Sequence, residues 1–240
     1  MDENSNLIQW QLLDDADAVA HEACERILRL SKQVIDKNGY FKIVLAGGGT
    51  PEQTYRLLRE ADCDWGRWHI YYGDERCLPD VDAERNSVMA SRAWLDHVPS
   101  AQVYAIPAHL GAVAGARGYA DIVKDALPFD MVLLGMGEDG HTASLFPGHR
   151  HSEDELVHAV FNAPKPPPER VSLSVAALCN SRDLLFLVTG AGKREAVAQW
   201  RRGDNVPIAQ IQPAGGATVL IDRAAFSTSS TDVTNGRVNW

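Results

Sequence analysis

The sequence is poor in cysteine, in positive charge and in long apolar stretches, and each shortage argues against a class of protein. Its cysteines show neither a Cys-x-x-Cys pair nor zinc-ligand spacing, so we expect structural or incidental free thiols and no metal. They are Cys24, Cys63, Cys77 and Cys179. Lys and Arg number 23 against 32 Asp and Glu, and the net charge of −9 argues against non-specific binding to nucleic acid or an anionic membrane. No run of ~18 apolar residues is present that would span a bilayer.

What remains is typical of a soluble globular protein. The chain has 240 residues, of which 45% are apolar and 23% charged, enough for one large domain or two small ones. No internal repeat or shift in composition divides it, so we expect a single domain over residues 1–226. The polar residues 227–240 are expected to form a poorly ordered tail. The acidic first residues are the reverse of a signal peptide and predict a cytoplasmic protein.

Hydrophobic periodicity predicts an alternation of helices and strands. A first helix is expected to begin at Asp14 or Asp15, to repeat apolar residues at steps of three and four, and to end at Gly39. The predicted strands are Tyr40–Ala46, Trp68–Tyr72, Asp130–Leu134, Val157–Phe161, Val171–Val175, Leu184–Thr189 and Thr218–Ile221. Further helices are predicted at Pro51–Glu60, Ser87–His97, Val113–Ala126 and Lys193–Arg201. This order indicates an α/β fold with a mostly parallel, doubly wound (Rossmann-like) sheet flanked by helices.

In such a sheet ligands bind at the carboxyl ends of the strands, and the loop after the first apolar strand is glycine-rich. Gly48, Gly49 and Thr50 precede a predicted helix, where backbone N–H groups and the helix dipole favour an anion such as phosphate. Thr50 and Gln53 have the spacing of a capping box. The loop lacks the Lys-Ser/Thr ending of a nucleotide-binding P-loop, and a plain tight turn is the alternative interpretation.

Two more loops follow strands. Gly73–Arg76 places charged residues at the rim of the predicted crevice, although a solvated loop with internal ion pairs has the same pattern. Gly135–Gly148 contains Gly-x-Gly-x-x-Gly, but Pro147 interrupts the helix that a dinucleotide site needs, and Val160 stands where its acidic residue is expected. Asp139 and His141 in this loop suit general acid–base chemistry instead.

Other motifs argue against hydrolysis by a nucleophilic serine and against metal chemistry. No Gly-x-Ser-x-Gly elbow is present. The three neighbouring histidines lack His-Glu-x-x-His spacing and are expected at the surface; they are His149, His151 and His158. Arg170 opens a predicted strand. Lys193 lies in the first turn of a helix, where its charge opposes the dipole unless an anionic ligand is near; an exposed lysine is the alternative.

Taken together, these motifs resemble the 6-phosphogluconolactonase family, which is related to glucosamine-6-phosphate isomerases and deaminases. The resemblance runs from about Ile43 to Lys193 and lies in Gly-Gly-Thr-Pro, Gly-Asp-Glu-Arg, the long central glycine loop, and Pro-Lys-Pro-Pro before an arginine. It implies hydrolysis of a sugar-phosphate lactone in the second step of the oxidative pentose phosphate pathway, in the cytosol and without a cofactor. We expect a monomer or weak homo-oligomer.

The resemblance also implies roles for particular residues. His141 would be the catalytic base with Asp74, Arg76 and Asp139 around it. The substrate phosphate would contact Gly48, Gly49, Thr50, Arg170 and Lys193. The segment Glu84–Ser87 departs from the Asp-Ser-Asn of many members, which makes Arg85 a candidate substrate contact.

Two other functions are alternatives. Amino-sugar-phosphate isomerases and deaminases carry Asn-Glu-Pro where this chain has Ser144–Pro147, which favours the lactonase. A non-catalytic sugar-phosphate sensor would normally add a helix-turn-helix domain, for which this chain is too short and too acidic.

Overall fold

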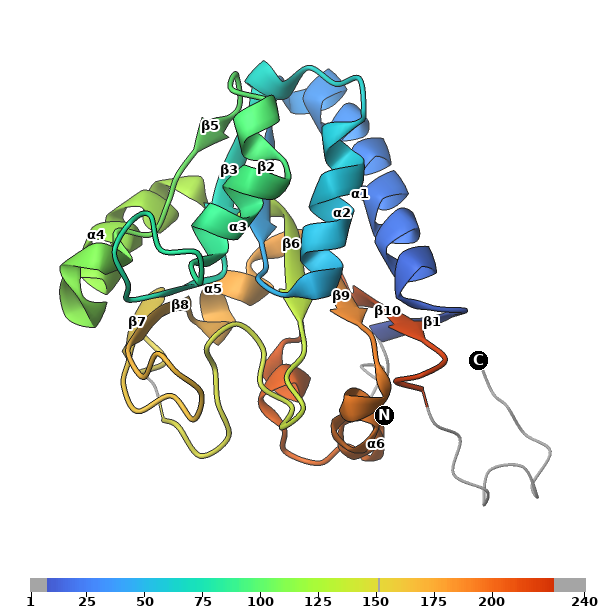
Figure 1. Cartoon of the computed structure of the whole chain (residues 1–240), viewed down its shortest axis with the longest axis vertical. Helices are drawn as coiled ribbons and strands as arrows, with labels where there is room; N and C mark the ends of the chain where they lie inside the picture. The colour runs from blue at the N-terminus through green and yellow to red at the C-terminus, as the bar shows by residue number, and fades with distance from the viewer. Residues whose placement is uncertain (1–7, 151, 227–240) are drawn as a thin grey trace.

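A computed structural model describes residues 8–150 and 152–226 of the chain (Figure 1). The expected tail at residues 227–240 and His151 lie outside the described residues. No helix in the described part is long and apolar enough to cross a membrane.

The centre of the fold is a seven-stranded sheet in which every neighbouring pair is parallel. In spatial order it contains β1 (Ile8–Leu13), β10 (Ala217–Asp222), β9 (Ser181–Val188), β6 (Phe129–Gly135), β2 (Phe41–Leu45), β3 (Trp68–Tyr72) and β5 (Gln102–Val103). The middle strands are buried almost throughout, as expected when both faces are covered. The predicted parallel α/β fold is therefore confirmed.

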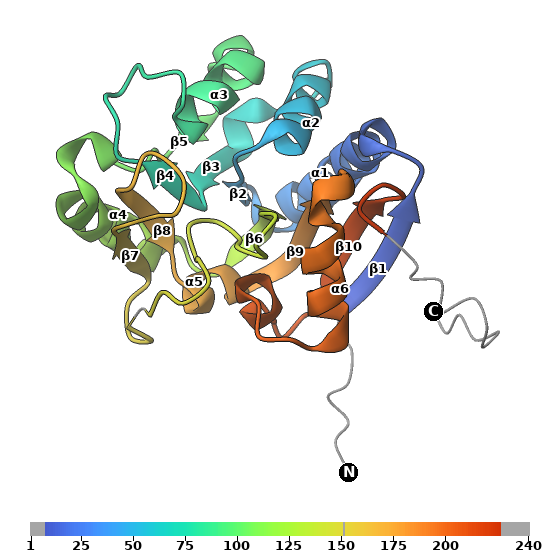
Figure 2. The ribbon, with the colours of Figure 1, turned by 60° about the horizontal axis from the view of Figure 1, so that its bottom comes forward.

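Helices cover both faces of this sheet. Figure 2 shows α1, α2 and α3 along one face and α4, α5 and α6 along the other. Their bounds are α1 (Ala16–Asn38), α2 (Gly49–Arg59), α3 (Asn86–Ala93), α4 (Ala112–Ala126), α5 (Val175–Cys179) and α6 (Arg194–Arg202).

The first helix agrees with its sequence signals. Asp15 caps α1 by accepting a hydrogen bond from Ala18 N at 2.9 Å. Gly39 ends it with φ 87°, and its N–H donates to Ile35 O at 2.8 Å. The expected helix at Ser87–His97 is instead divided, because α3 ends at Ala93 and a short 3₁₀ turn follows at Leu95–His97.

A second, three-stranded antiparallel sheet was not predicted. It consists of β4 (Asp74–Arg76), β8 (Arg170–Leu173) and β7 (Val157–Val160) and packs beside α4 (Figure 2). The prediction that Gly73–Arg76 is a loop is wrong from Asp74 onward, since β4 pairs with β8. The strand predicted to reach Val175 ends at Leu173, because Ser174 caps α5 through Ala177 N at 3.1 Å.

Gly73 joins the two sheets. Its N–H donates to Leu45 O at the end of β2, at 2.9 Å. Its carbonyl oxygen accepts from Leu173 N at the end of β8, at 2.8 Å. A single residue between β3 and β4 is therefore hydrogen-bonded to both sheets.

The structure tests two further predictions, that the cysteines are free thiols and that the neighbouring histidines lie at the surface. All four cysteines are free, and burial raises the pKa of Cys24 and of Cys77 to about 11. The prediction that His158 lies at the surface is wrong, since it is 3% exposed on β7 with its Nδ1 3.1 Å from Glu155 Oε2. His149 is partly exposed and packs against Phe146.

Candidate active site

A cavity of about 480 Å³ lies at the carboxyl edge of the large sheet, a size suited to a small-molecule ligand. The loops after β2, β6 and β9 contribute to its wall, and so does the second sheet. Eight of the nine predicted site residues line it: Gly48, Gly49, Thr50, Asp74, Arg76, His141, Arg170 and Lys193. The ninth, Asp139, contacts the cavity through His141.

His141 and Asp139 form a pair within the loop after β6. The Nδ1 of His141 lies 2.5 Å from Asp139 Oδ1, and the His141 side chain is 18% exposed. Because an ionised carboxylate only accepts hydrogen bonds, this contact requires a proton on Nδ1, and in the neutral imidazole Nε2 is then the acceptor. A Cβ at Gly137 would lie 2.0 Å from His141 Nδ1, so only glycine allows this close packing.

The electrostatics of this pair keep Asp139 ionised. Burial acts to raise the pKa of Asp139, but the hydrogen bonds from the side chain and backbone of His141 outweigh it, and the pKa is lowered. The imidazole ring also packs against Phe146, with ring centroids 4.7 Å apart. The pair is therefore an oriented imidazole backed by a negative charge.

Two arginines face each other across the second sheet. Arg76 of β4 and Arg170 of β8 are directly opposite partners in the antiparallel register. Like charges at such positions are destabilising, and an anion between them would remove the repulsion. Within the described chain the buried Nε of Arg76 has no hydrogen-bond partner. This arrangement favours a negatively charged ligand.

Arg170 is fixed by the proline-rich segment before it. Its Nη2 donates to Lys165 O at 3.0 Å and its Nε to Pro167 O at 3.2 Å. Burial lowers the pKa of Arg170, although Asp74 opposes the shift. Lys165 itself lines the cavity and was missed from the sequence, because its segment was interpreted only as a stiff connection.

Lys193 lies at the end of the short turn Ala191–Lys193 that precedes α6. Burial lowers the pKa of Lys193, Glu138 opposes this shift, and the nearby charge of Lys165 adds to it. Two lysines thus join the arginines around one cavity. Other lining residues that were not predicted as site residues include Asn86, Thr142, Phe146 and Thr189.

The glycine-rich loop differs locally from its prediction. Helix α2 begins at Gly49 with Gly48 as its N-cap at φ 110°, a conformation that suits glycine. The expected capping box is wrong: Thr50 Oγ1 lies 2.6 Å from Thr189 Oγ1, and Gln53 donates to Asp17 at 2.5 Å. The first turn of α2 still borders the cavity, as an anion site at a helix N-terminus requires.

Asp74 is buried and held by two donors. Ser144 Oγ donates to its Oδ2 at 2.5 Å, and Asn86 Nδ2 donates to its Oδ1 at 3.0 Å.

Arg85, the candidate substrate contact, does not line the cavity. It is 2% exposed and ion-paired with Glu75 and Asp80, so that prediction is wrong.

The parallel sheet carries an oriented imidazole and several cationic side chains at its carboxyl edge. These features define an α/β protein with a site for an anionic small molecule. Residues 14–220 match the family described as glucosamine-6-phosphate isomerases/6-phosphogluconolactonase. The chain belongs to this family.

Known proteins of this family support the match. The 6-phosphogluconolactonase of Mycobacterium tuberculosis is 37% identical over 209 residues, covering 78% of this chain and 83% of the relative. That of Mycobacterium leprae is 36% identical over 228 residues, covering 88% of this chain and 91% of the relative. The crystal structure of 6-phosphogluconolactonase from Thermotoga maritima superposes with a TM-score of 0.83 at 26% identity, covering 90% of this chain and 100% of that one. The resemblance found in the motifs is confirmed.

Proposed function

We propose that this protein hydrolyses 6-phospho-D-glucono-1,5-lactone to 6-phosphogluconate. The observation that carries the proposal is the His141–Asp139 pair in the wall of a cavity that Arg76, Arg170 and Lys193 also line. The relatives named 6-phosphogluconolactonase support it. The protein acts in the cytoplasm on a small sugar phosphate, as a monomer or weak homo-oligomer, and binds no nucleic acid.

The reaction needs one base and one oriented water. The Nε2 of His141 takes a proton from water as the water oxygen attacks C1 of the lactone. Asp139 stabilises the resulting imidazolium, and Arg76 stabilises the negative charge on the former carbonyl oxygen. The tetrahedral intermediate collapses with cleavage of the bond between C1 and the ring oxygen, which receives the proton from His141.

The phosphate orients the lactone for this attack. The first turn of α2 at Gly48–Thr50, together with Arg170, Lys193 and Lys165, binds the phosphate dianion. Fixing this remote group holds C1 near His141, so part of the activation entropy is removed by binding.

The segment that separates this chain from amino-sugar isomerases favours the lactonase. Ser144 is fully buried and donates to Asp74, and Leu145 and Phe146 are buried as well. No carboxylate is available at these positions for the ring-opening chemistry of an amino sugar. We therefore do not propose a deaminase.

Freshly prepared 6-phosphogluconolactone is expected to be hydrolysed faster than its spontaneous rate, with saturation kinetics. Proton release in a weakly buffered solution measures the reaction, and the enzyme-free rate at the same pH is the blank. A folded protein that adds nothing to the blank would contradict the proposed function. Release of ammonia from glucosamine 6-phosphate would support the alternative activity.

Binding of the product is expected to weaken as the pH rises above neutrality. Because burial lowers the pKa of Lys193, its ammonium is lost at a lower pH than that of an ordinary lysine, and a phosphate contact is lost with it. Calorimetric titration of 6-phosphogluconate at a series of pH values measures the effect.

The matched variant is Lys193→Arg, whose guanidinium stays charged over this range. It is expected to show a smaller pH dependence of the dissociation constant than the parent. The same slope in both proteins would remove Lys193 from the phosphate site.

A further inference from the structure

The strand β4 presents its three side chains to two different environments. Asp74 and Arg76 line the cavity, whereas Glu75 between them is fully buried away from it, as strand alternation requires. The proposed mechanism gives Glu75 no part. A buried carboxylate is nevertheless costly unless its oxygens are satisfied, so its partners indicate what it does.

Each oxygen of Glu75 has partners in a second element. Oε1 accepts from the backbone N–H of Arg76 at 2.9 Å and of Asn86 at 2.8 Å. Oε2 accepts from the N–H of Ser87 at 2.8 Å and lies 3.4 Å from Arg85 Nε. Glu75 therefore forms an ion pair with Arg85 and accepts three backbone hydrogen bonds, two of them from Asn86 and Ser87.

These donors belong to the beginning of α3. The N-cap residue Arg85 makes no side-chain capping hydrogen bond, so the first N–H groups of the helix have no local acceptor. Glu75 supplies that acceptor and places a negative charge at the positive end of the helix dipole. The carboxylate thus fastens the start of α3 to β4.

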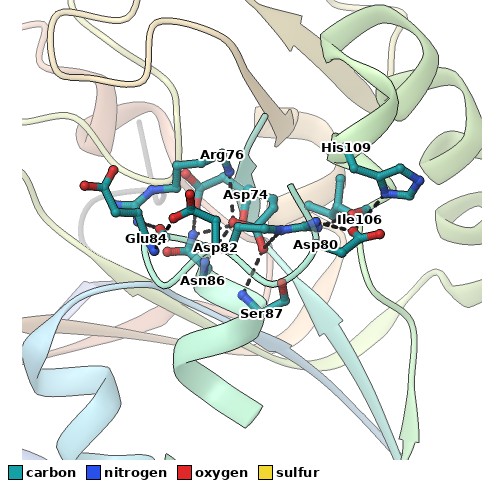
Figure 3. Close-up of polar contacts among 11 residues, drawn as sticks. Asp74, Arg76, Asp80, Asp82, Glu84, Asn86, Ser87, Ile106 and His109 are labelled. Carbon is teal, nitrogen blue, oxygen red and sulfur yellow. Dashed lines mark hydrogen bonds and ion pairs between the residues drawn. The ribbon is translucent and has the colours of Figure 1, made fainter. Parts of the chain in front are cut away.

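The same helix start holds both neighbours of Glu75. The carbonyl oxygen of Glu84 accepts from Arg76 Nη1, and Asn86 Nδ2 donates to Asp74 O and Oδ1, both at 3.0 Å. Figure 3 shows Arg76 beside Glu84 and Asp74 beside Asn86. Glu84 and Asn86 reach the cavity residues, while Arg85 between them pairs with the buried Glu75.

Arg85 is anchored on its other side as well. Its Nη1 pairs with Asp80, which also lies 2.9 Å from His109 Nδ1, and its Nη2 donates to Ile106 O at 3.0 Å (Figure 3). The guanidinium therefore connects β4 to the segments around Asp80 and Ile106. Substitution at Arg85 would release the helix start from all three.

We infer that Glu75 and Arg85 are positioning residues for the reaction: their buried ion pair holds the start of α3 against β4 and thereby fixes Asp74 and Arg76 in the cavity. The inference rests on the proposed lactonase function. Neither residue touches the substrate. Their effect passes through Glu84 and Asn86.

Glu75→Gln is expected to lower kcat about 10²-fold, the loss associated with a reacting group displaced by ~1 Å. The amide loses the charge that faces Arg85 and keeps one acceptor oxygen, so its NH₂ is set against at least one backbone N–H donor and the helix start must move. KM is expected to stay within about twofold, because other elements carry the phosphate contacts of Arg170 and Lys193. Steady-state kinetics on 6-phosphogluconolactone give both constants.

Asp130→Asn is the matched control. Asp130 is also a buried carboxylate, 2% exposed, which accepts from Lys42 N at 2.9 Å and lies 3.4 Å from Arg182 Nε. It lies at the amino end of β6, away from the cavity. Its variant is expected to lose thermal stability while keeping the parental kcat.

The outcomes separate the hypotheses. If the parent enzyme is active and Glu75→Gln keeps its kcat while losing as much stability as the control, the role is structural and the inference is wrong. A rise in KM at constant kcat also overturns it. An inactive, folded parent would contradict the proposed function instead.

Arg85 provides a second test, which applies even if Glu75→Gln does not fold. Arg85→Met removes the ion pair, whereas Arg85→Lys keeps a positive charge near Glu75. We expect Arg85→Lys to recover a large part of the kcat that Arg85→Met loses, with KM unchanged in both. Equal kcat in the two variants, at the parental level, would overturn the inference.

Discussion

Replacing His141 with asparagine is expected to lower kcat by ~10²–10⁴ with little change in KM, the usual loss when a general base is removed. The asparagine keeps a polar side chain in the loop after β6 but cannot take a proton from water. Asp139 would then lie beside a group that carries no positive charge at any stage. Steady-state kinetics with the spontaneous rate subtracted measure the effect.

The pH profile of the parent enzyme gives an independent check. Activity is expected to fall on acidification, since a protonated imidazole cannot accept a proton. His97 is exposed and does not line the cavity. His97→Asn is therefore a matched control and is expected to keep the parental kcat. Unchanged kcat with a raised KM in His141→Asn would assign His141 to binding, and the base would then be sought at Asp74 or Asp139.

Glucono-1,5-lactone without phosphate is expected to be a much poorer substrate than its phosphorylated form. Losing two charge-assisted hydrogen bonds removes ~3–6 kcal/mol at ~1.5–3 kcal/mol each. That range corresponds to a roughly 10²–10⁴-fold lower kcat/KM. Parallel proton-release assays on the two lactones at one salt concentration measure the ratio.

A variant locates this discrimination in the cavity. Arg170→Met is expected to reduce the preference for the phosphorylated lactone, because it removes a cation without altering the His141–Asp139 pair. Equal kcat/KM values for the two lactones in the parent protein would contradict the assignment of Arg170 and Lys193 to phosphate.

Most of the large sheet could be predicted because its strands are short, apolar and separated by amphipathic helices. The strand at Trp68–Tyr72 is observed with its predicted bounds. Most candidate site residues could be predicted because they follow these strands, whereas Arg170 begins β8 of the small sheet and was implied by the family resemblance. Their proximity then follows from the parallel order of the sheet, and the cavity brings them together.

What the sequence did not reveal depends on contacts between distant segments. β4 has only three residues, all charged, and forms because its backbone pairs with β8. Thr50 and Gln53 match a local capping pattern, yet Thr189 and Asp17 provide their observed partners. Arginine is usually found at the protein surface. Only the fold brings Arg85 against the buried Glu75.

The hydrogen bonds of Gly73 have a mechanical consequence. His141 follows a strand of the large sheet, whereas Arg76 and Arg170 belong to the small one. Sliding between the sheets would therefore separate His141 from the two arginines that line the same cavity. Gly73 is hydrogen-bonded to β2 through its N–H and to β8 through its carbonyl oxygen, and these two bonds restrain movement of one sheet relative to the other. We therefore expect the two walls of the cavity to move together, so that the proposed substrate would bind to a site that is already assembled.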